Sequence, residues 1–381
     1  MNVHDLKRDE FMLTGSFAKK GYDWWWHSLT AVNEETGEEK PFFIEFFTCN
    51  PALGGDKPIL GQLPENKKNG IYPSYLMIKV GTWGKEHFQL HKFIGWDHVK
   101  IHEKAPFSVE AEGGYFLSEK ETHGHVKIED AASHPEWMCD DGEISWDLKI
   151  DKKVAFNVGY GASTPFRAMK AFEMYWHAEG MKTQYEGTIT CNGVNYIVKP
   201  ESSYGYADKN WGCGFTTPWV WLSSNNLTSR VTKKKLENSV FDIGGGRPKA
   251  FGIAMNRKLL GEFFYEGRSY EFNFSKFWTG SKTEFSFDEN ERKVYWKVRQ
   301  ETFKYVMITE IECKKENMLL VNYEAPDGSK RHNQLWNGGN GKGRIRLYKK
   351  GKNGLDLIDD IDAMNVGCEY GEYSNDTVIA D

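Results

Sequence analysis

A short segment in the middle of the chain places a phenol, a carboxyl and an amide at alternating positions. Residues 204–212 read YGYADKNWG. If this segment is extended, Tyr206, Asp208 and Asn210 share one face, because successive side chains of a strand point to opposite sides. Together they could transfer a proton and orient a substrate oxygen. Lys209 and Trp211 would share the other face, and a charged strand end with a tryptophan that plugs a small barrel would look the same, so a structural role stays open.

Aromatic residues cluster in two further segments. Residues 218–226 read PWVWLSSNN, and residues 24–26 are three consecutive tryptophans. In a strand, Trp24 and Trp26 would face one way and Trp25 the other, so they either form core or line a cavity. The 24 Phe, 18 Tyr and 14 Trp make up 15% of the chain, and each can bury roughly 150–250 Å². Large apolar interiors or pockets are therefore expected.

The elements that would position these residues are predominantly strands. Ile144, Trp146, Leu148 and Ile150 alternate with polar residues, as in a half-buried strand. Asn-Gly at 192–193 lies between two alternating runs and predicts a hairpin. Further hairpin turns are predicted at 69–70 and 353–354, a strand at 294–298, two strands within 303–323, and a turn at 326–328. This spacing favours antiparallel sheets that close into barrels or pack as sandwiches.

Helix and linker signals are sparse. The best helix candidate runs from Thr164 to Ala171, with Pro165 at its first position. The most linker-like segment is 223–248, which includes three consecutive glycines, although a surface loop would have the same composition. The length of 381 residues predicts two domains. We place them at residues 1–214 and 215–381.

Charge and composition exclude several classes of partner. The net charge is −5, and no basic run exceeds Lys233–Lys235, so no nucleic-acid or anionic-membrane footprint is predicted. No apolar run approaches the ~18 residues of a membrane helix. The six cysteines are spread singly, which favours free thiols in a reducing compartment. The first ten residues are too polar for a signal peptide, and we predict a cytoplasmic protein of unknown oligomeric state.

Other candidate constellations are weaker. His123 and His125 would share one strand face, but no second pair with carboxylates stands at metal-ligand spacing, so no metal is predicted. The glycines at 244–246 lack the pattern of a phosphate loop, and no cofactor motif is present. Glu369 is expected to be a surface residue of the last strand rather than a second acid.

Four segments occur in the order seen in the tocopherol cyclase family, which this chain resembles. They are residues 174–177 (MYWH), the hairpin at 187–193, residues 205–212 (GYADKNWG) and residues 219–225 (WVWLSSN). The family typically has a His-containing strand, a Gly-rich hairpin, a Gly-Tyr-x-Glu/Asp-Lys-x-Trp-Gly segment and an aromatic strand that ends in Asn. Weaker echoes lie at 15–26 and 367–371. Residues 201–204 (ESSY) contain less Gly than in relatives, and residues 215–219 (FTTPW) replace a Phe-Pro-aromatic run, which leaves the substrate open.

The resemblance implies two tandem lipocalin-like antiparallel β-barrels, similar to carotenoid hydratases and two-barrel Diels-Alderases, with the ligand in or between the barrels. It also implies ring closure by addition of a phenol to a prenyl double bond. Protonation of an alkene requires an acid that keeps its proton at neutral pH, and burial can raise the pKa of a carboxyl by up to ~3–5. Asp208 is the carboxyl of choice. Aromatic faces would stabilise the carbocation by about 0.5–2 kcal/mol each.

We therefore predict an all-β, cofactor-independent cyclase or isomerase that acts on a hydrophobic phenolic or prenylated molecule. A non-catalytic lipocalin-like carrier or sensor, which would have Asp208 on the outer surface beside Lys209, and a carbohydrate-active protein are the alternatives. The predicted catalytic residues are Asp208, Lys209, Asn210, Tyr206 and His177. The predicted substrate-binding residues are Trp24, Trp26, Tyr175, Trp211, Trp219, Trp221 and Asn225.

Overall fold

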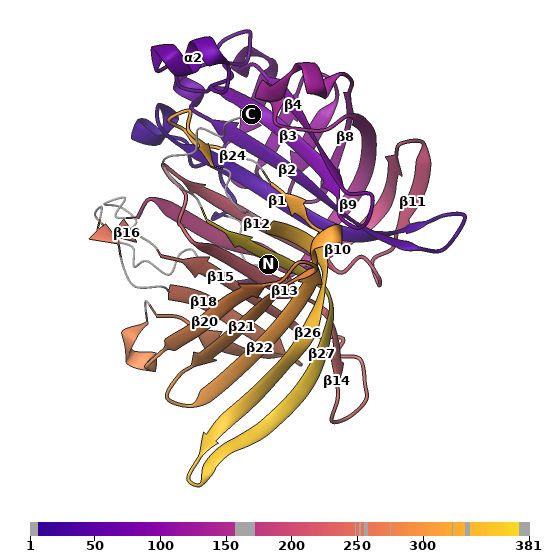
Figure 1. Cartoon of the computed structure of the whole chain (residues 1–381), viewed down its shortest axis with the longest axis vertical. Helices are drawn as coiled ribbons and strands as arrows, with labels where there is room; N and C mark the ends of the chain where they lie inside the picture. Colours follow the sequence, from indigo (N-terminus) through magenta and orange to yellow (C-terminus); the bar gives the residue numbers. More distant parts are fainter. Residues whose placement is uncertain are drawn as a thin grey trace.

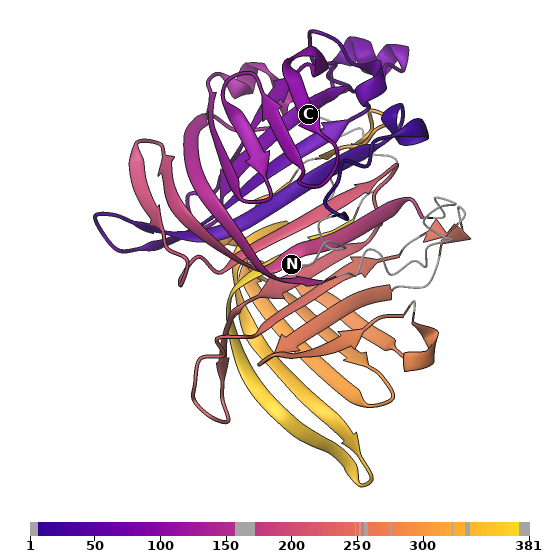
Figure 2. The ribbon, with the colours of Figure 1, turned by 180° about the vertical axis from the view of Figure 1, so that it is seen from behind.

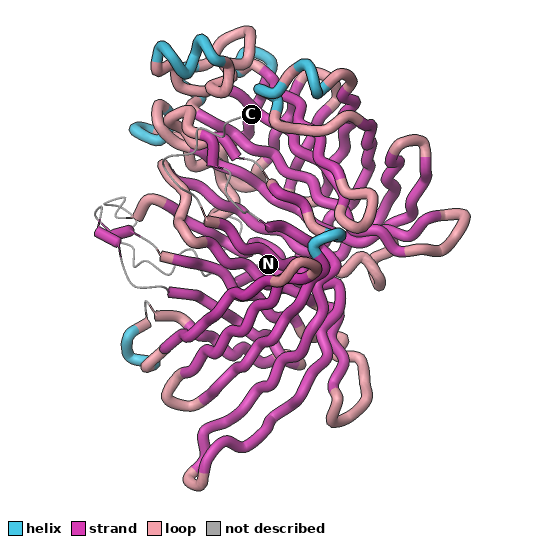
Figure 3. Tube along the Cα trace, in the orientation of Figure 1, coloured by secondary structure: helices cyan, strands magenta, loops and turns pink. Residues whose placement is uncertain are grey.

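The computed structural model describes residues 7–156, 172–247, 249–250, 253–254, 258–274, 276–321, 323–331 and 336–372. Strands dominate this part of the chain, and the few helices are short (Figure 3). The predicted all-β class is therefore confirmed. Among the described residues the one α-helix is α2 (Pro64–Asn69). The 3-10 helices are η1 (Gly15–Ala18), η2 (Pro51–Leu53), η3 (Trp96–His98), η4 (Ala131–Ser133), η5 (Pro135–Trp137), η6 (Phe277–Thr279) and η7 (Lys315–Asn317).

Twelve strands form the first sheet, which occupies the upper part of Figure 1. The order is β4-β3-β2-β1-β11-β10-β9-β8-β7-β6-β5, and β12 pairs with both β1 and β10. The bounds are β1 (Tyr22–Asn33), β2 (Glu39–Cys49), β3 (Tyr75–Thr82), β4 (Phe88–Ile94), β5 (Val99–His102), β6 (Ser108–Ala111), β7 (Tyr115–Ser118), β8 (Glu121–Ile128), β9 (Gly142–Phe156), β10 (Met174–Cys191), β11 (Val194–Val198) and β12 (Gly205–Gly212).

Eleven strands form the second sheet, in the lower part of Figure 1. The order is β19-β18-β15-β13-β27-β26-β22-β21-β20, while β14 pairs with β27 and β23 with β26. The bounds are β13 (Trp219–Ser224), β14 (Asn226–Ser229), β15 (Val240–Gly246), β18 (Lys258–Tyr265), β19 (Arg268–Phe272), β20 (Lys282–Glu289), β21 (Lys293–Glu301), β22 (Tyr305–Lys314), β23 (Leu319–Leu320), β26 (Trp336–Gly351) and β27 (Gly354–Gly371). Two small sheets pair β16 (Lys249–Ala250) with β17 (Ile253–Ala254), and β24 (Tyr323–Glu324) with β25 (Lys330–Arg331).

Both large sheets are antiparallel and strongly curved, and they stack against each other in front and back views (Figures 1 and 2). One apolar core fills the first sheet and another fills the second. A third cluster contains residues of both sheets, including Trp24 of β1 and Trp221 of β13. The strands between two cores are buried on both faces, so every residue of β12 is buried. The lipocalin-like expectation of two barrel-like sheets agrees with this arrangement.

The predicted strands and turns have mixed outcomes. The alternation at 144–150 is confirmed in β9, and the hairpins at 192–193 and 353–354 join β10 to β11 and β26 to β27. The hairpin predicted at 69–70 is wrong, because Asn69 ends α2 and Gly70 caps it with φ 62°. The linker-like segment is also corrected, since its glycines belong to β15, an inner strand of the second sheet. The helix predicted at 164–171 lies outside the described residues.

The first sheet ends with β12 and the second begins with β13. The domain division at 214/215 stays a prediction. No helix in the described ranges has the length and apolar character to cross a membrane. All six cysteines are free thiols.

Candidate functional site

A narrow cavity lies where the two sheets meet. The volume of this cavity is about 30 Å³. It has room for about two water molecules, so a larger guest requires the lining side chains to move. Its lining combines aromatic rings with two carboxyls and an amide: Trp24, Trp26, Tyr206, Asp208, Trp219, Trp221, Tyr323, Asn337 and Glu369. The first sheet contributes β1 and β12, and the second contributes β13, β26 and β27.

Asp208 is buried in this wall, with 8% of its surface exposed. Its Oδ2 accepts a hydrogen bond from Trp176 Nε1 at 2.7 Å and from the Tyr206 hydroxyl at 3.3 Å. Its Oδ1 is buried and has no hydrogen-bond partner among the described residues. Burial raises the pKa of Asp208 well above its ordinary value, against the opposing effect of the Trp176 hydrogen bond. Burial therefore favours the protonated form of this carboxyl, and one of its oxygens has no hydrogen-bond partner among the described residues.

Asp242 of β15, in the second sheet, lies next to the hydroxyl of Tyr206. The Tyr206 hydroxyl is 3.4 Å from Asp242 Oδ2, and Trp221 Nε1 donates to Asp242 Oδ1 at 3.2 Å. Burial and the nearby Asp208 raise the pKa of Asp242 well above its ordinary value. Tyr206 thus bridges two carboxyls that come from different sheets.

Glu369 of β27 is the second carboxyl in the cavity wall. Its Oε2 accepts from Trp219 Nε1 at 2.6 Å, and its Oε1 accepts from Asn337 Nδ2 at 3.1 Å. Burial raises its pKa to about 7, although these two hydrogen bonds oppose the shift. Only 9% of its surface is exposed. The expectation that Glu369 is a surface residue is therefore wrong, because the second sheet turns this side of β27 toward the first.

Two glycines make room for the indoles that bind these acids. A Cβ at Gly244 of β15 would lie 2.7 Å from Trp176 Cη2. A Cβ at Gly367 of β27 would overlap the ring of Trp221. A side chain at either position would displace the tryptophan. Gly244 therefore leaves room for the Trp176 ring, and the three glycines belong to strand β15 rather than to a flexible linker.

The opposite face of β12 points into the core of the first sheet. There the Lys209 ammonium pairs with the carboxylate of Asp23, and both side chains are fully buried. Lys209 Nζ also lies 3.8 Å from the centre of the Trp25 ring. Trp211 stacks on Tyr175 with ring centres 5.5 Å apart. Strand alternation thus separates the predicted site residues Lys209, Trp211 and Tyr175 from the cavity.

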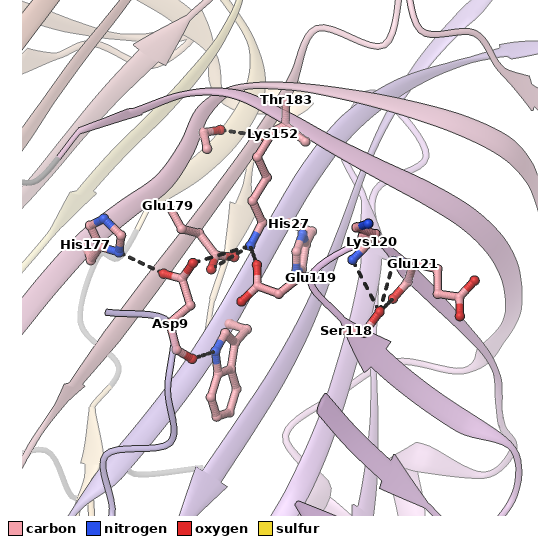
Figure 4. A network of polar contacts seen from close by, with 12 residues as sticks. Asp9, His27, Ser118, Glu119, Lys120, Glu121, Lys152, His177, Glu179 and Thr183 are labelled. Atoms are coloured by element: carbon pink, nitrogen blue, oxygen red, sulfur yellow. Dashed lines mark hydrogen bonds and ion pairs between the residues drawn. The ribbon is translucent and has the colours of Figure 1, made fainter. Parts of the chain in front are cut away.

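A buried charged network occupies the same core (Figure 4). Lys152 Nζ lies 2.8 Å from both Glu119 Oε2 and Glu179 Oε2, and 3.8 Å from Asp9 Oδ2. His177 Nδ1 is 2.8 Å from Asp9 Oδ1. Asp9, Glu119 and Glu179 are close enough together to hold a cation, but the Lys152 ammonium already lies among them. His177 thus belongs to this network, on the far side of β10 from the cavity.

Four histidines outside the cavity, including the pair considered as metal ligands, have surroundings of their own. His91 bonds to the Trp137 carbonyl at 2.8 Å. His98 lies between Asp56 and Glu112. His123 and His125 are exposed on β8, where His125 pairs with Glu143.

Six of the predicted site residues line the cavity: Trp24, Trp26, Tyr206, Asp208, Trp219 and Trp221. Asn210 lies on the same face of β12, but its Oδ1 accepts from the Tyr22 hydroxyl at 2.8 Å. Asn225 lines a neighbouring narrow cavity and donates to the Gly205 carbonyl at 2.9 Å. Lys209, Trp211, Tyr175 and His177 lie on the other face. The role of each residue stays a prediction.

Five residues of this site were not predicted from the sequence: Trp176, Asp242, Tyr323, Asn337 and Glu369. Period-two alternation could have found Trp176, since it must face away from Tyr175 and His177 within residues 174–177. The other four belong to the second sheet or its connections. No local pattern indicates which of their side chains meet β12.

Comparisons with known proteins identify the family of this chain. The family model described as tocopherol cyclase-like matches residues 52–372. The chloroplastic tocopherol cyclase of Zea mays is 30% identical over 135 residues, which are 35% of this chain and 25% of that protein. The matched part of the chain thus spans about a quarter of the length of this curated relative.

Solved structures with a similar course of the chain were also found. Kievitone hydratase from Nectria haematococca aligns over 94% of this chain and 93% of its own, with 11% identity and a TM-score of 0.48. The structure of CghA with Sch210972 aligns over 93% and 89%, with 10% identity and a TM-score of 0.46. The family model, in contrast, covers far more than half of the sequence. The chain belongs to the tocopherol cyclase-like family.

Proposed function

We propose that this protein is a cofactor-independent cyclase or isomerase that protonates a double bond of a hydrophobic phenolic or prenylated molecule. Asp208 is the proton donor, and the cavity between the sheets is the reaction site. Membership of the tocopherol cyclase-like family supports a cyclase or isomerase type of enzyme. The observation that carries the proposal is a buried carboxyl in a ring-lined cavity with one oxygen unpartnered.

The surroundings of Asp208 suit a general acid. Its hydrogen-bond donors, Trp176 and Tyr206, are neutral, so no adjacent cation holds it ionised through a hydrogen bond. A carboxyl that keeps its proton at neutral pH can pass that proton to an alkene carbon.

The walls suit the cation that protonation creates. Trp24, Trp26, Trp219 and Trp221 present indole rings to the cavity. Each aromatic face attracts a desolvated positive charge by about 0.5–2 kcal/mol. The absence of bulk water from so narrow a space would also protect a carbocation from early capture.

Asp208 on the outer surface, paired with Lys209 or an arginine, would favour the carrier alternative. Asp208 is instead buried against the cavity, and Lys209 points to the other face of β12 and pairs with Asp23. This placement favours catalysis over simple carriage.

The test measures ring closure of an ortho-prenylphenol by the full chain in D₂O. The wild-type protein should place deuterium from Asp208 on the carbon that gains hydrogen. Asp208→Asn should reduce the rate by about 10²–10⁴-fold. Asp359→Asn is the matched control, because Asp359 is buried in the second sheet, bonded to Ser229 and Tyr265, and does not line the cavity. Equal rates for wild type and Asp208→Asn would refute the donor assignment.

A further inference from the structure

We infer that Glu369 is a second catalytic residue of this cavity, which accepts the proton of a hydroxyl nucleophile while Asp208 protonates the alkene. This inference rests on the proposed function and extends it. It implies that the substrate carries an O–H group that adds across its double bond, rather than an alkene that only isomerises.

The two carboxyls reach the same cavity from different sheets. Asp208 belongs to β12 of the first sheet and Glu369 to β27 of the second, and both line the space between them. They are close enough that the charge of Glu369 contributes to the raised pKa of Asp208. A guest between the sheets would therefore contact one carboxyl from each.

The carboxyl of Glu369 is held in a fixed orientation. Trp219 Nε1 binds one oxygen at 2.6 Å and Asn337 Nδ2 binds the other at 3.1 Å. Each carboxylate oxygen has two lone-pair sites, so one site on each oxygen remains for a substrate hydroxyl. Trp219 and Asn337 line the cavity as well, which places the held carboxyl at its surface.

The electrostatic environments of the two acids differ in the direction that the roles require. Both carboxyls accept hydrogen bonds from neutral donors, and burial raises the pKa of Asp208 well above its ordinary value. Glu369 has a pKa of about 7, where burial and the charge of Glu45 raise it and Lys79 lowers it. With a pKa of about 7, Glu369 is partly ionised at neutral pH, whereas burial favours the protonated form of Asp208. Paired carboxyls whose environments separate their pKa values are typical of an acid and a base.

The proposed step balances in atoms and charge. The proton of Asp208 forms a C–H bond with one alkene carbon, and the π electrons of the alkene supply that bond. The substrate oxygen forms a C–O bond with the other carbon, and its own proton passes to the Glu369 carboxylate. Asp208 ends ionised and Glu369 protonated, and return of one proton from Glu369 to Asp208 restores the starting state. The product is an isomer of the substrate, and no oxidant or reductant is needed.

Two reactions in D₂O separate the roles of the acids. Ring closure of ortho-prenylphenol requires both, whereas deuterium exchange into the prenyl chain of recovered substrate requires only reversible protonation by Asp208. Glu369→Gln should reduce ring closure by about 10²–10⁴-fold and leave exchange within about threefold of wild type. Asp208→Asn should lose both. Glu324→Gln is the matched control, because Glu324 is buried with a pKa of about 7 and binds Tyr75, yet does not line the cavity.

A second probe gives a measurement that does not depend on the folding of a variant. The O-methyl ether of ortho-prenylphenol has no proton to give to Glu369. The wild-type protein should exchange deuterium into this ether without closing its ring, as Glu369→Gln should do with the phenol. This agreement would support the inference.

Four outcomes would overturn it or separate it from the proposed function. Ring closure by Glu369→Gln within threefold of wild type would remove Glu369 as proton acceptor. If Glu369→Gln loses both exchange and ring closure, Glu369 affects the reaction only indirectly, by shaping the cavity or by influencing Asp208. Activity in Asp208→Asn but not in Glu369→Gln would refute the donor assignment and keep the acceptor. Neither closure nor exchange by the wild-type protein would refute both assignments.

Discussion

Both faces of β12 bury ionisable side chains, but these side chains have different kinds of partner on the two faces. On the face toward the first core, Lys209 is paired with Asp23 inside an aromatic shell. On the face toward the second sheet, Asp208 is bonded by the indole of Trp176 and the phenol of Tyr206. Adjacent residues of one strand thus experience an ion pair on one side and neutral donors on the other.

The difference explains which face can carry out chemistry. An ion pair keeps both partners charged and costs several kcal/mol when one partner is removed, so it stabilises one arrangement. Neutral donors do not repay the desolvation of a carboxylate, so the acid stays protonated. The ion-paired face has the features of a structural core, and the other face has those of a proton donor.

The largest expected effect tests the ion-paired face. Asp23→Asn removes the anionic partner of Lys209 and leaves a fully buried ammonium uncompensated. We expect the free energy of unfolding to fall by about 3–5 kcal/mol, measured by urea denaturation at pH 7. The double variant Asp23→Asn/Lys209→Met should recover much of this loss, since it removes the unpaired charge. A loss below about 1 kcal/mol in the single variant would contradict the distinction between the faces.

The next largest effect is the pH dependence of stability that Glu369 contributes from the other wall of the cavity. The pKa of Glu369 is about 7 in the folded chain and ordinarily 4.5, so between about pH 4.5 and 7 the folded state holds a proton that the unfolded state has released. Its contribution to stability therefore falls as pH rises through this window, by up to about 1.4 kcal/mol per pH unit. Glu369→Gln should remove this slope. Urea denaturation at pH 5, 6 and 7 measures it, and an unchanged slope would mean that Glu369 titrates alike in both states.

The smallest effect is expected at the predicted proton donor itself. Asp208→Asn replaces one neutral group by another, and the amide oxygen can still accept from Trp176. We expect the free energy of unfolding at pH 7 to change by less than about 1 kcal/mol, in contrast to the same substitution at Asp23. Thermal and urea denaturation of the two variants side by side make the comparison. Equal losses at positions 23 and 208 would show that both carboxyls are held as charges.

Alternation along strands allowed much of this site to be predicted. It separates Trp24 and Trp26 from Trp25, and the structure places the first two at the cavity and the third in the core of the first sheet. The same rule puts Lys209 on the face opposite Asp208. Lys209 is also among the predicted catalytic residues, and the structure places it in the ion pair with Asp23, on the face away from the cavity; its role stays a prediction.

The partners of Asp208 could not be predicted in the same way. Asp242 and Glu369 reach the site through the packing of one sheet on the other, which no local period encodes. The glycines of β15 were misleading for a related reason. A run of glycines predicts a loop when it is considered alone, but here Gly244 lies in an inner strand because Trp176 needs the space.

Because the cavity takes one carboxyl from each sheet, neither half of the molecule contains a complete site. The distance between the proposed donor, Asp208, and the proposed acceptor, Glu369, depends on how β12 and β27 face each other across the cavity rather than on the geometry of either strand. A displacement of about 1 Å between reacting groups can cost about 10²-fold in rate. Substitutions remote from the cavity that slide one sheet over the other would therefore impair turnover while the fold and every lining side chain remain intact.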